Sequence, residues 1–301
     1  MPINSKNFPL VSIIMNCYNG QKFIAESVKS ILAQTYKNFE VIFWDNQSND
    51  NSAEIYKSFK DKRLKYYYAN THTSLYEARN FAIKKAKGKL ISFLDTDDLW
   101  IKDKLNLQVK KFRNKKIGLV YSNYYILNQI TGFKKKFYKR RLPEGFIFEN
   151  LLKEYFIGIC TVMLKRSIFQ NNRQLFNKKY NIIGDFDLFM RISKKNYFSS
   201  INFPLAIYRV HNKSLSNKNY KMHISELKFW IKNQKNLSEN DLFYIKKKIE
   251  YMDILFNLIN KKKSIFLLKK IFKIKFSIIK IKLIVFYLIP NFLLKKIKEI
   301  L

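Results

Sequence analysis

Glycine and cysteine are scarce in this sequence of 301 residues, and their scarcity excludes several classes of protein. None of the 7 glycines forms the G-x-G-x-x-G or G-x-x-x-x-G-K-[ST] pattern that binds dinucleotides or nucleoside triphosphates. The two cysteines, Cys17 and Cys160, exclude a disulfide scaffold and a cysteine-rich zinc module. Residues 1 to 16 lack the basic start and long apolar core of a signal peptide. The chemistry is therefore expected from polar side chains.

Acidic residues are also few, with 22 Asp and Glu against 58 Lys and Arg, so the formal net charge is +36. Such a charge favours binding to nucleic acid, because Lys and Arg neutralise phosphates. However, an A/T-rich coding sequence also enriches Lys, together with the abundant Asn, Ile, Phe and Tyr. The sequence contains no zinc-finger spacing, RNP-like segment or recognisable helix-turn-helix. We therefore do not expect nucleic acid as the partner. The alternative interpretation, a non-catalytic protein that uses its basic surface as a scaffold or to bind nucleic acid, is kept for comparison.

The length predicts about two domains, at roughly 150 residues each. A change of composition near residue 217 divides the chain into residues 1–216 and a helical, Lys-rich region, residues 217–301. Residues 261–301 contain 12 Lys and one acidic residue, which suits an anionic membrane surface. The uncharged run at 283–294 is too short to span a bilayer, and Pro290 interrupts it. We predict peripheral, in-plane association with the cytoplasmic membrane; the alternative is a helical addition that packs on residues 1–216.

The first hundred residues alternate apolar runs with segments of helical periodicity, which predicts an α/β fold. A mostly parallel sheet flanked by helices follows from this alternation, because each parallel pair of strands needs a crossover connection. The expected strands are Val11–Met15, Phe39–Trp44, Leu64–Tyr68 and Leu90–Leu94, and the expected helices are Lys22–Ala33, Ser52–Lys60 and Leu75–Ala86.

Polar side chains follow three of these strands at the point where each strand ends. Tyr18 follows the first strand, Asp45 the second, and Asp95-Thr96-Asp97-Asp98 the fourth. Open parallel sheets bind ligands beyond the carboxyl ends of their strands, so these side chains are expected at one edge. Three carboxylates within four residues repel one another and require a compensating cation. Hard oxygen ligands in an Asp-x-Asp pattern suit Mg²⁺ or Mn²⁺, which would bridge the phosphates of a nucleotide.

Five segments in this order resemble glycosyltransferase family 2, whose members are inverting enzymes with the GT-A fold. The resemblance covers roughly residues 9 to 216, and five ordered motifs make a chance agreement improbable. The segments are Val11–Ser52, Ala78-Arg79-Asn80 with Lys87-Gly88, Phe93–Trp100, Gly184–Leu188 and Tyr208–Ser216.

The resemblance implies a role for individual residues. Tyr18 and Asp45 would contact the base, Arg79 and Asp95 the rest of the nucleotide, and Asp97 and His211 the metal, while Asp185 would be the general base. It further implies a nucleotide-sugar donor (a UDP-sugar), Mn²⁺ or Mg²⁺, and a glycan or lipid-linked acceptor of a bacterial surface polysaccharide such as lipopolysaccharide or capsule. The chain departs from the family pattern at Asn46, Gln47 and Gly184.

Simpler structural roles compete with some of these assignments. Asp185 could cap the N-terminus of a helix that we expect to start at Leu188, although Asp187 fits that role better. His72 is assigned a structural role, as is His223. The basic segment at 133–141 is expected to be a loop.

Overall fold

A computed structural model describes residues 9–170, 175–212, 214, 219–235, 237–260, 263–274, 278–291 and 293–294. The chain forms two compact units, one of Met1–Leu127 with Phe133–Arg209 and one of Asn128–Gly132 with Val210–Leu301. The division into a catalytic domain, residues 1–216, and a membrane-associating region, residues 217–301, stays a prediction.

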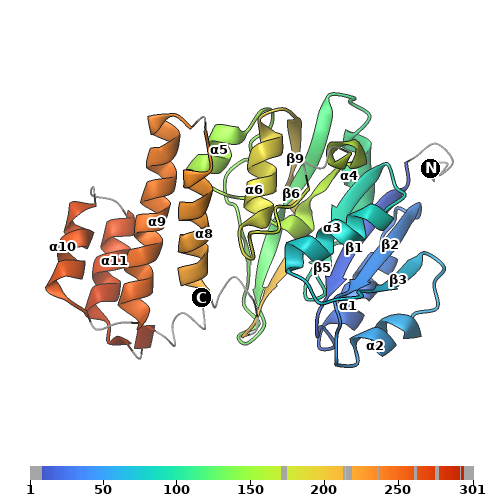
Figure 1. Cartoon of the computed structure of the whole chain (residues 1–301), viewed down its shortest axis with the longest axis horizontal. Helices are drawn as coiled ribbons and strands as arrows, with labels where there is room; N and C mark the ends of the chain where they lie inside the picture. The colour runs from blue at the N-terminus through green and yellow to red at the C-terminus, as the bar shows by residue number, and fades with distance from the viewer. Residues whose placement is uncertain are drawn as a thin grey trace. The chain divides into compact units, whose positions relative to one another are not determined.

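The first unit contains the predicted parallel strands, which lie in the order β3-β2-β1-β4. Figure 1 labels the first three of them. These strands are β1 (Val11–Cys17), β2 (Phe39–Asp45), β3 (Leu64–Tyr68) and β4 (Leu90–Phe93). Helices α1 (Ile24–Leu32), α2 (Ser52–Ser58) and α3 (Leu75–Lys85) connect them. Every one of these elements overlaps the segment predicted for it. The apolar runs were sufficient because strands covered on both faces carry few polar residues.

Beyond β4 the sheet becomes antiparallel and continues in the order β8-β6-β9-β5, with β7 paired to β6. The fold is thus α/β of the GT-A type, and its parallel character belongs to the N-terminal half. The added strands are β5 (Leu99–Trp100), β6 (Ile117–Asn128), β7 (Lys134–Lys136), β8 (Met163–Lys165) and β9 (Tyr197–Val210). The remaining helical segments are α4 (Lys104–Lys111), α5 (Phe148–Lys153), α6 (Gly184–Ser193) and the short 3-10 turns η2 (Ile159–Thr161) and η3 (Arg166–Phe169).

The basic segment at 133–141 is not entirely a loop, because Lys134–Lys136 forms the strand β7. All three lysines are exposed, and β7 pairs with β6 through backbone atoms. Charged side chains are typical of edge strands, where they discourage further pairing. The expectation of a loop from charge alone was therefore wrong at these three residues.

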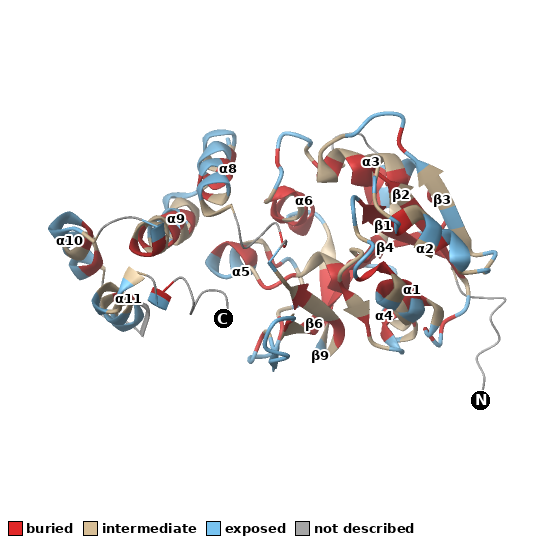
Figure 2. Cartoon of the chain, turned by 90° about the horizontal axis from the view of Figure 1, so that it is seen from below, coloured by how far each residue is buried: buried red, intermediate tan, exposed pale blue. Residues whose placement is uncertain are grey.

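The core of the first unit lies between the parallel strands and the helices on either side (Figure 2). Alternate residues of β1, Val11, Ile13 and Met15, pack with Ile24 and Val28 of α1 and are inaccessible to solvent. Each such side chain contributes about 1.5–3 kcal/mol through its burial. This packing fixes the ends of β1, β2 and β4 and hence the loops that follow them.

The second unit consists of helices α8 (Tyr220–Lys232), α9 (Glu239–Asn260), α10 (Ile265–Lys273) and α11 (Ile278–Leu288). A small core joins the last three, and its buried members are Ile254, Leu258, Leu267, Ile271, Leu283 and Leu294. Helix α11 ends two residues before Pro290, as the missing N–H of proline requires. Within the described part of the chain, no helix is both long and apolar enough to cross a membrane.

Candidate active site

The carboxyl ends of β1, β2 and β4 meet at one edge of the sheet. The parallel register pairs Cys17 with Asp45 and Ile14 with Phe93, so the loops after these three strands emerge side by side. This register agrees with the expectation that Tyr18, Asp45 and Asp95 lie at one polar edge of the sheet.

Asp45 is inaccessible to solvent and is held on both of its oxygens. Its Oδ1 accepts a hydrogen bond from the Ser48 N–H at 2.8 Å, and its Oδ2 accepts one from the Tyr66 hydroxyl at 2.7 Å. Burial raises the pKa of Tyr66, with the hydrogen bond to Asp45 acting in the same direction, so this hydroxyl remains a donor. The carboxylate is thus fixed in orientation, and its contact with a base stays a prediction.

Tyr18 is 55% exposed and lies against His72, to which the sequence analysis assigned only a structural role. Its ring centroid is 4.4 Å from that of His72, which is also exposed. His72 is held in turn by the loop after β2, since its Nδ1 lies 2.8 Å from the Asn46 carbonyl oxygen. The Asn46 amide donates to the Thr73 carbonyl at 2.8 Å. Tyr18 and His72 therefore form an exposed aromatic pair at the sheet edge, suited to contact with a planar base.

Arg79 of α3 provides a cation for the acidic loop, Asp95–Asp98. Its Nη2 lies 2.6 and 2.8 Å from the two oxygens of Asp95, and the arginine is only 2% exposed. The sequence assigned this compensation to a divalent ion. The structure shows that the Arg79 guanidinium pairs with Asp95 through charge-assisted hydrogen bonds.

Asp98 relieves the crowding of carboxylates in a second way. Burial raises its pKa well above the ordinary value, and the charges of Asp97 and Asp95 act in the same direction. Its Oδ1 accepts a hydrogen bond from the Arg209 N–H at 2.9 Å. Burial of Asp98 and the ion pair of Asp95 with Arg79 thus both reduce the repulsion among the three carboxylates.

Arg209 holds the acidic loop, a role that the sequence analysis missed. It is 3% exposed, its Nε donates to the Asp97 carbonyl at 2.8 Å, and its Nη2 contacts Glu26 of α1 at 2.7 Å. The only signal of this role in the sequence was the place of Arg209 in the segment Tyr208–Ser216, which resembles the family. His211 follows two residues later in the second unit, where its N–H donates to the Ser214 hydroxyl at 3.0 Å. Its role at a metal stays a prediction.

Helix α6 starts at Gly184, four residues earlier than expected. Asp187 is consequently not a cap but lies in the first turn, where its Oδ2 accepts from Arg191 at 2.9 Å. The glycine at this start packs directly against an aromatic ring. A Cβ at Gly184 would lie 2.5 Å from Cδ2 of Tyr76, too close for any side chain. Gly184, which departs from the family pattern, thus leaves room for the ring of Tyr76.

Asp185 lies beside three donors in the first turn of α6. Its Oδ1 accepts from the Phe186 N–H at 2.8 Å, and the hydroxyls of Tyr76 and Tyr155 lie 3.2 Å from Oδ1 and Oδ2, respectively. The Tyr76 hydroxyl shares its proton between Asp185 and the Ile182 carbonyl oxygen, which lies 2.7 Å away. Burial raises the pKa of Asp185, while these hydrogen bonds and Arg79 oppose the rise. A carboxylate with a raised pKa is a better proton acceptor, so this environment suits a general base.

Arg79 connects the two carboxylates that matter most. It pairs with Asp95 and lies 5.3 Å from the centroid of the Tyr76 ring, whose hydroxyl reaches Asp185. The structure therefore brings Arg79, Asp95 and Asp185 into one network, with Tyr76 as the link.

The described residues contain no cluster of three or more His, Cys, Asp or Glu side chains that could hold a metal ion. Asp95 and Asp97 nevertheless lie in one loop. Mg²⁺ and related ions are commonly held by one or two carboxylates, with substrate phosphates supplying further oxygens. Two carboxylates in one loop at the expected ligand-binding edge of the sheet fit that mode.

Comparison with known proteins gives a consistent picture. The family model described as glycosyl transferase family 2 matches residues 12–198. The chain is 36% identical over 216 residues to an Escherichia coli protein, the UDP-Glc:alpha-D-GlcNAc-diphosphoundecaprenol beta-1,3-glucosyltransferase WfgD. This alignment covers 70% of the chain and 81% of WfgD.

Two solved structures share the fold at low sequence identity. S. aureus TarS 1-349 in complex with UDP-GlcNAc is 18% identical, with a TM-score of 0.61, over 88% of this chain and 76% of that one. The mannosyltransferase PcManGT from Pyrobaculum calidifontis, in complex with GDP-Man and Mn²⁺, is 16% identical, with a TM-score of 0.61. That match covers 94% of this chain and 80% of the other.

Proposed function

The chain belongs to glycosyl transferase family 2, and from this premise we propose that it moves a sugar from a UDP-sugar to a hydroxyl of a lipid-linked glycan. Membership of an enzymatic family sets aside the alternative of a non-catalytic nucleic-acid-binding or scaffold protein. The observation that carries the proposal is the network of Asp95, Arg79, Tyr76 and Asp185, which links the nucleotide edge of the sheet to a candidate base.

The proposed reaction is a single in-line displacement with inversion. Asp185 accepts the proton of the acceptor hydroxyl as its oxygen forms a bond to the anomeric carbon. The bond from that carbon to the diphosphate oxygen breaks, and the nucleoside diphosphate leaves with the bonding electrons. The raised pKa of Asp185 favours this proton transfer, and the hydroxyls of Tyr76 and Tyr155 hold the carboxylate in place.

The carboxylates of the acidic loop suit the diphosphate end of the donor. Bound by Asp97 with Asp95 beside it, a Mn²⁺ or Mg²⁺ ion would supply positive charge for the departing diphosphate. The ion pair of Asp95 with Arg79 limits the negative charge that this loop presents. The Mn²⁺ in the complex of PcManGT supports a divalent ion here.

Relatives support the choice of donor and acceptor. The name of WfgD gives UDP-Glc as donor and a diphosphoundecaprenol-linked sugar as acceptor, and the TarS complex contains UDP-GlcNAc. A lipid-linked acceptor would place the work of this chain at a membrane, within the synthesis of a bacterial surface polysaccharide such as lipopolysaccharide or capsule.

Helices α10 and α11 support peripheral, in-plane association with the cytoplasmic leaflet. They bury Leu267, Ile271 and Leu283 in their own core but leave other apolar side chains exposed. Ile265 is 73% exposed and Leu288 is 75% exposed, with the lysines of the same helices nearby in sequence. An apolar surface flanked by lysines is typical of helices that lie in the interface of anionic membranes.

A screen of nucleotide sugars tests the proposal directly. Thermal unfolding would be followed with UDP-, GDP-, dTDP- and CDP-sugars, each with Mn²⁺ and with excess chelator. We expect a UDP-sugar to raise the midpoint only when Mn²⁺ is present, since a ligand that binds the folded state alone stabilises it. The same donor should then support transfer to a polyprenyl-diphosphate-linked sugar. A midpoint unmoved by every donor would contradict the proposal.

A further inference from the structure

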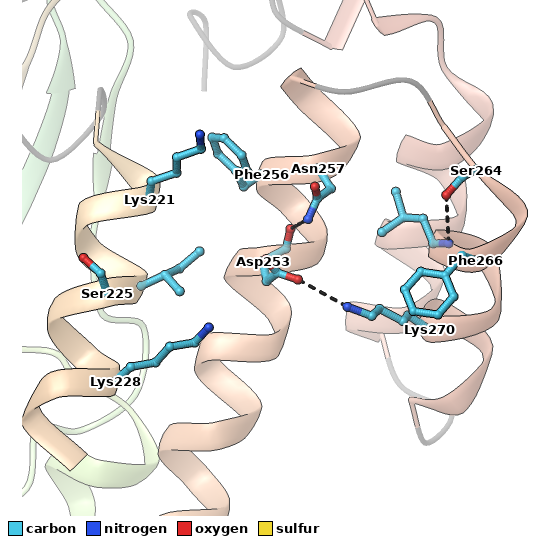
Figure 3. A pocket seen from close by; sticks show the side chains of 11 residues that line it. Lys221, Ser225, Lys228, Asp253, Phe256, Asn257, Ser264, Phe266 and Lys270 are labelled. Atoms are coloured by element: carbon cyan, nitrogen blue, oxygen red, sulfur yellow. Dashed lines mark hydrogen bonds and ion pairs between the residues drawn. The ribbon is translucent and has the colours of Figure 1, made fainter. Parts of the chain in front are cut away.

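A pocket of about 610 Å³ lies in the second unit, outside the segment that matches the family (Figure 3). Helix α8 supplies one wall with Lys221, Ser225 and Lys228, whose spacing of four and three residues puts them on one helical face. Helices α9 and α10 supply the rest of the lining. A volume of this size is ordinary for a site that binds a small molecule.

The pocket carries a net positive charge, because three lysines line it with a single aspartate. Lys270 pairs with that aspartate, Asp253, at 3.5 Å. Among the residues that the structure describes, no carboxylate lies within ion-pair distance of Lys221 or Lys228. Both point toward α9 in Figure 3. Two exposed ammonium groups on one face suit an anion that accepts several hydrogen bonds, as a phosphate does.

Aromatic rings lie beside the lysines. Lys221 is 5.5 Å from the centroid of the Phe256 ring, and Lys270 is 5.2 Å from that of Phe266. Leu267 and Ile224 add further apolar lining. A free inorganic anion would make no use of these groups. A ligand that joins a phosphate to an apolar chain would use both, and the exposed Ile265 lies next to Phe266.

We propose that this pocket binds the phosphate group of a membrane lipid, with Lys221 and Lys228 at the phosphate oxygens and Phe256 and Phe266 at the start of the apolar chain. The proposal rests on the proposed function, which brings the chain to a membrane. The phosphate comes either from the diphosphate of a polyprenyl-linked acceptor or from an anionic phospholipid. An acidic protein segment is less suited, because it has no apolar chain for the rings.

The test compares two double variants of the full chain that lose the same charge. Lys221→Gln with Lys228→Gln alters the pocket, while Lys232→Gln with Lys246→Gln removes two exposed lysines elsewhere on α8 and α9. Flotation with vesicles of phosphatidylcholine, alone or with phosphatidylglycerol or a polyprenyl diphosphate, measures binding. We expect the pocket variant to bind anionic vesicles about tenfold more weakly than its control. Direct charge-assisted hydrogen bonds to phosphate oxygens, which the control lysines do not make, contribute on this order.

The arms of the experiment separate the sources of phosphate. Strong binding with phosphatidylglycerol alone assigns a phospholipid, and binding that needs the polyprenyl diphosphate assigns the acceptor. Equal weakening of the two variants would overturn the proposal, because it would show a general charge effect. Competition by poly-glutamate as strong as that by the lipid would also overturn it, in favour of an acidic protein.

Failure of the proposed function has a different signature. The UDP-sugar thermal shift of the wild-type chain tests that function without any lipid. If the wild type transfers sugar and the pocket variant floats like the control, only the proposal of a lipid-binding pocket is contradicted. A wild type without any response to nucleotide sugars contradicts the enzymatic proposal, whichever way the vesicles behave.

Discussion

Charged side chains are used differently in the two compact units. In the first, the guanidinium groups of Arg79 and Arg209 are almost wholly buried, and each reaches a carboxylate within 2.7 Å. In the second, lysines such as Lys221 and Lys269 are exposed. A buried guanidinium depends on one partner and one geometry, whereas exposed charges act together and are screened by salt. Single substitutions should therefore have large local effects in the first unit and small, salt-dependent effects in the second.

The largest effect is expected at Asp97. Asp97→Ala should abolish nucleotide binding that depends on a divalent ion, and with it turnover, because the loop loses the carboxylate proposed to hold the ion. The fold should survive, since Arg209 contacts the backbone carbonyl of Asp97. Titration calorimetry with a UDP-sugar and Mn²⁺ measures the loss. Asp103→Ala, which removes an exposed carboxylate nearby, is the control, and full wild-type activity in excess chelator would contradict the idea.

Asp185→Asn should lower turnover by about 10²-fold or more, with little change in donor binding, because the amide cannot accept the proton. Steady-state kinetics and donor titration separate the two quantities. Asp187→Asn is the informative neighbour, since it removes an ion pair with Arg191 and should reduce stability rather than turnover. Equal activity of the Asp185 variant would move the base elsewhere, and Asp187 would be the first candidate.

A smaller effect is expected from the hydroxyls around Asp185. Because burial raises the pKa of Asp185, the ionised base is lost as the pH falls, and kcat/KM should drop on the acid side at a higher pH than for an ordinary aspartate. The hydrogen bonds of Tyr76 and Tyr155 lower this pKa. Tyr76→Phe and Tyr155→Phe should each move the acid limb to still higher pH.

The pH profile distinguishes this tuning from a merely structural role. The tyrosine variants should recover activity at alkaline pH, whereas a damaged fold would not. Tyr36→Phe removes a hydroxyl bonded to the Pro9 carbonyl, remote in sequence from Asp185, and serves as the control. An acid limb that stays in place in both variants would show that the hydroxyls do not tune the base.

Much of the first unit could be predicted from the sequence because its signals are local. Apolar runs mark β1 to β4, and the polar residues after each strand mark the edge where ligands bind. The compensation of Asp95 could not be predicted in the same way. An arginine on a helix has many possible partners, and only the packing of α3 selects this one.

The missed features depend on contacts between distant segments. Arg209 reaches the acidic loop from 111 residues away, and Tyr76 reaches Asp185 across 109 residues. The start of α6 was placed too late because the consecutive apolar residues of this helix begin only at Leu188. The ring of Tyr76 requires a residue without a Cβ at position 184, and the sequence alone does not show that tertiary contact.

The smallest effect on catalysis is expected in the second unit, and it separates the two units most clearly. Removing residues 261–301 would uncover Ile254 and Leu258, so exposed residues are the sharper targets. Ile265→Ser with Leu288→Ser should reduce binding to anionic vesicles several-fold, because apolar area no longer enters the interface. Transfer to a water-soluble acceptor should be unchanged.

The matched control for this last variant is Phe203→Ser, which removes a side chain 74% exposed in the first unit. Its vesicle binding should equal that of the wild type. High salt should release part of the wild-type chain, because the lysines act through screened charges, and the apolar contacts should hold the remainder. A wild-type chain that stays unbound at low salt with anionic vesicles would contradict the membrane role. The exposed apolar residues of α10 and α11 would then need another partner, such as a second protein.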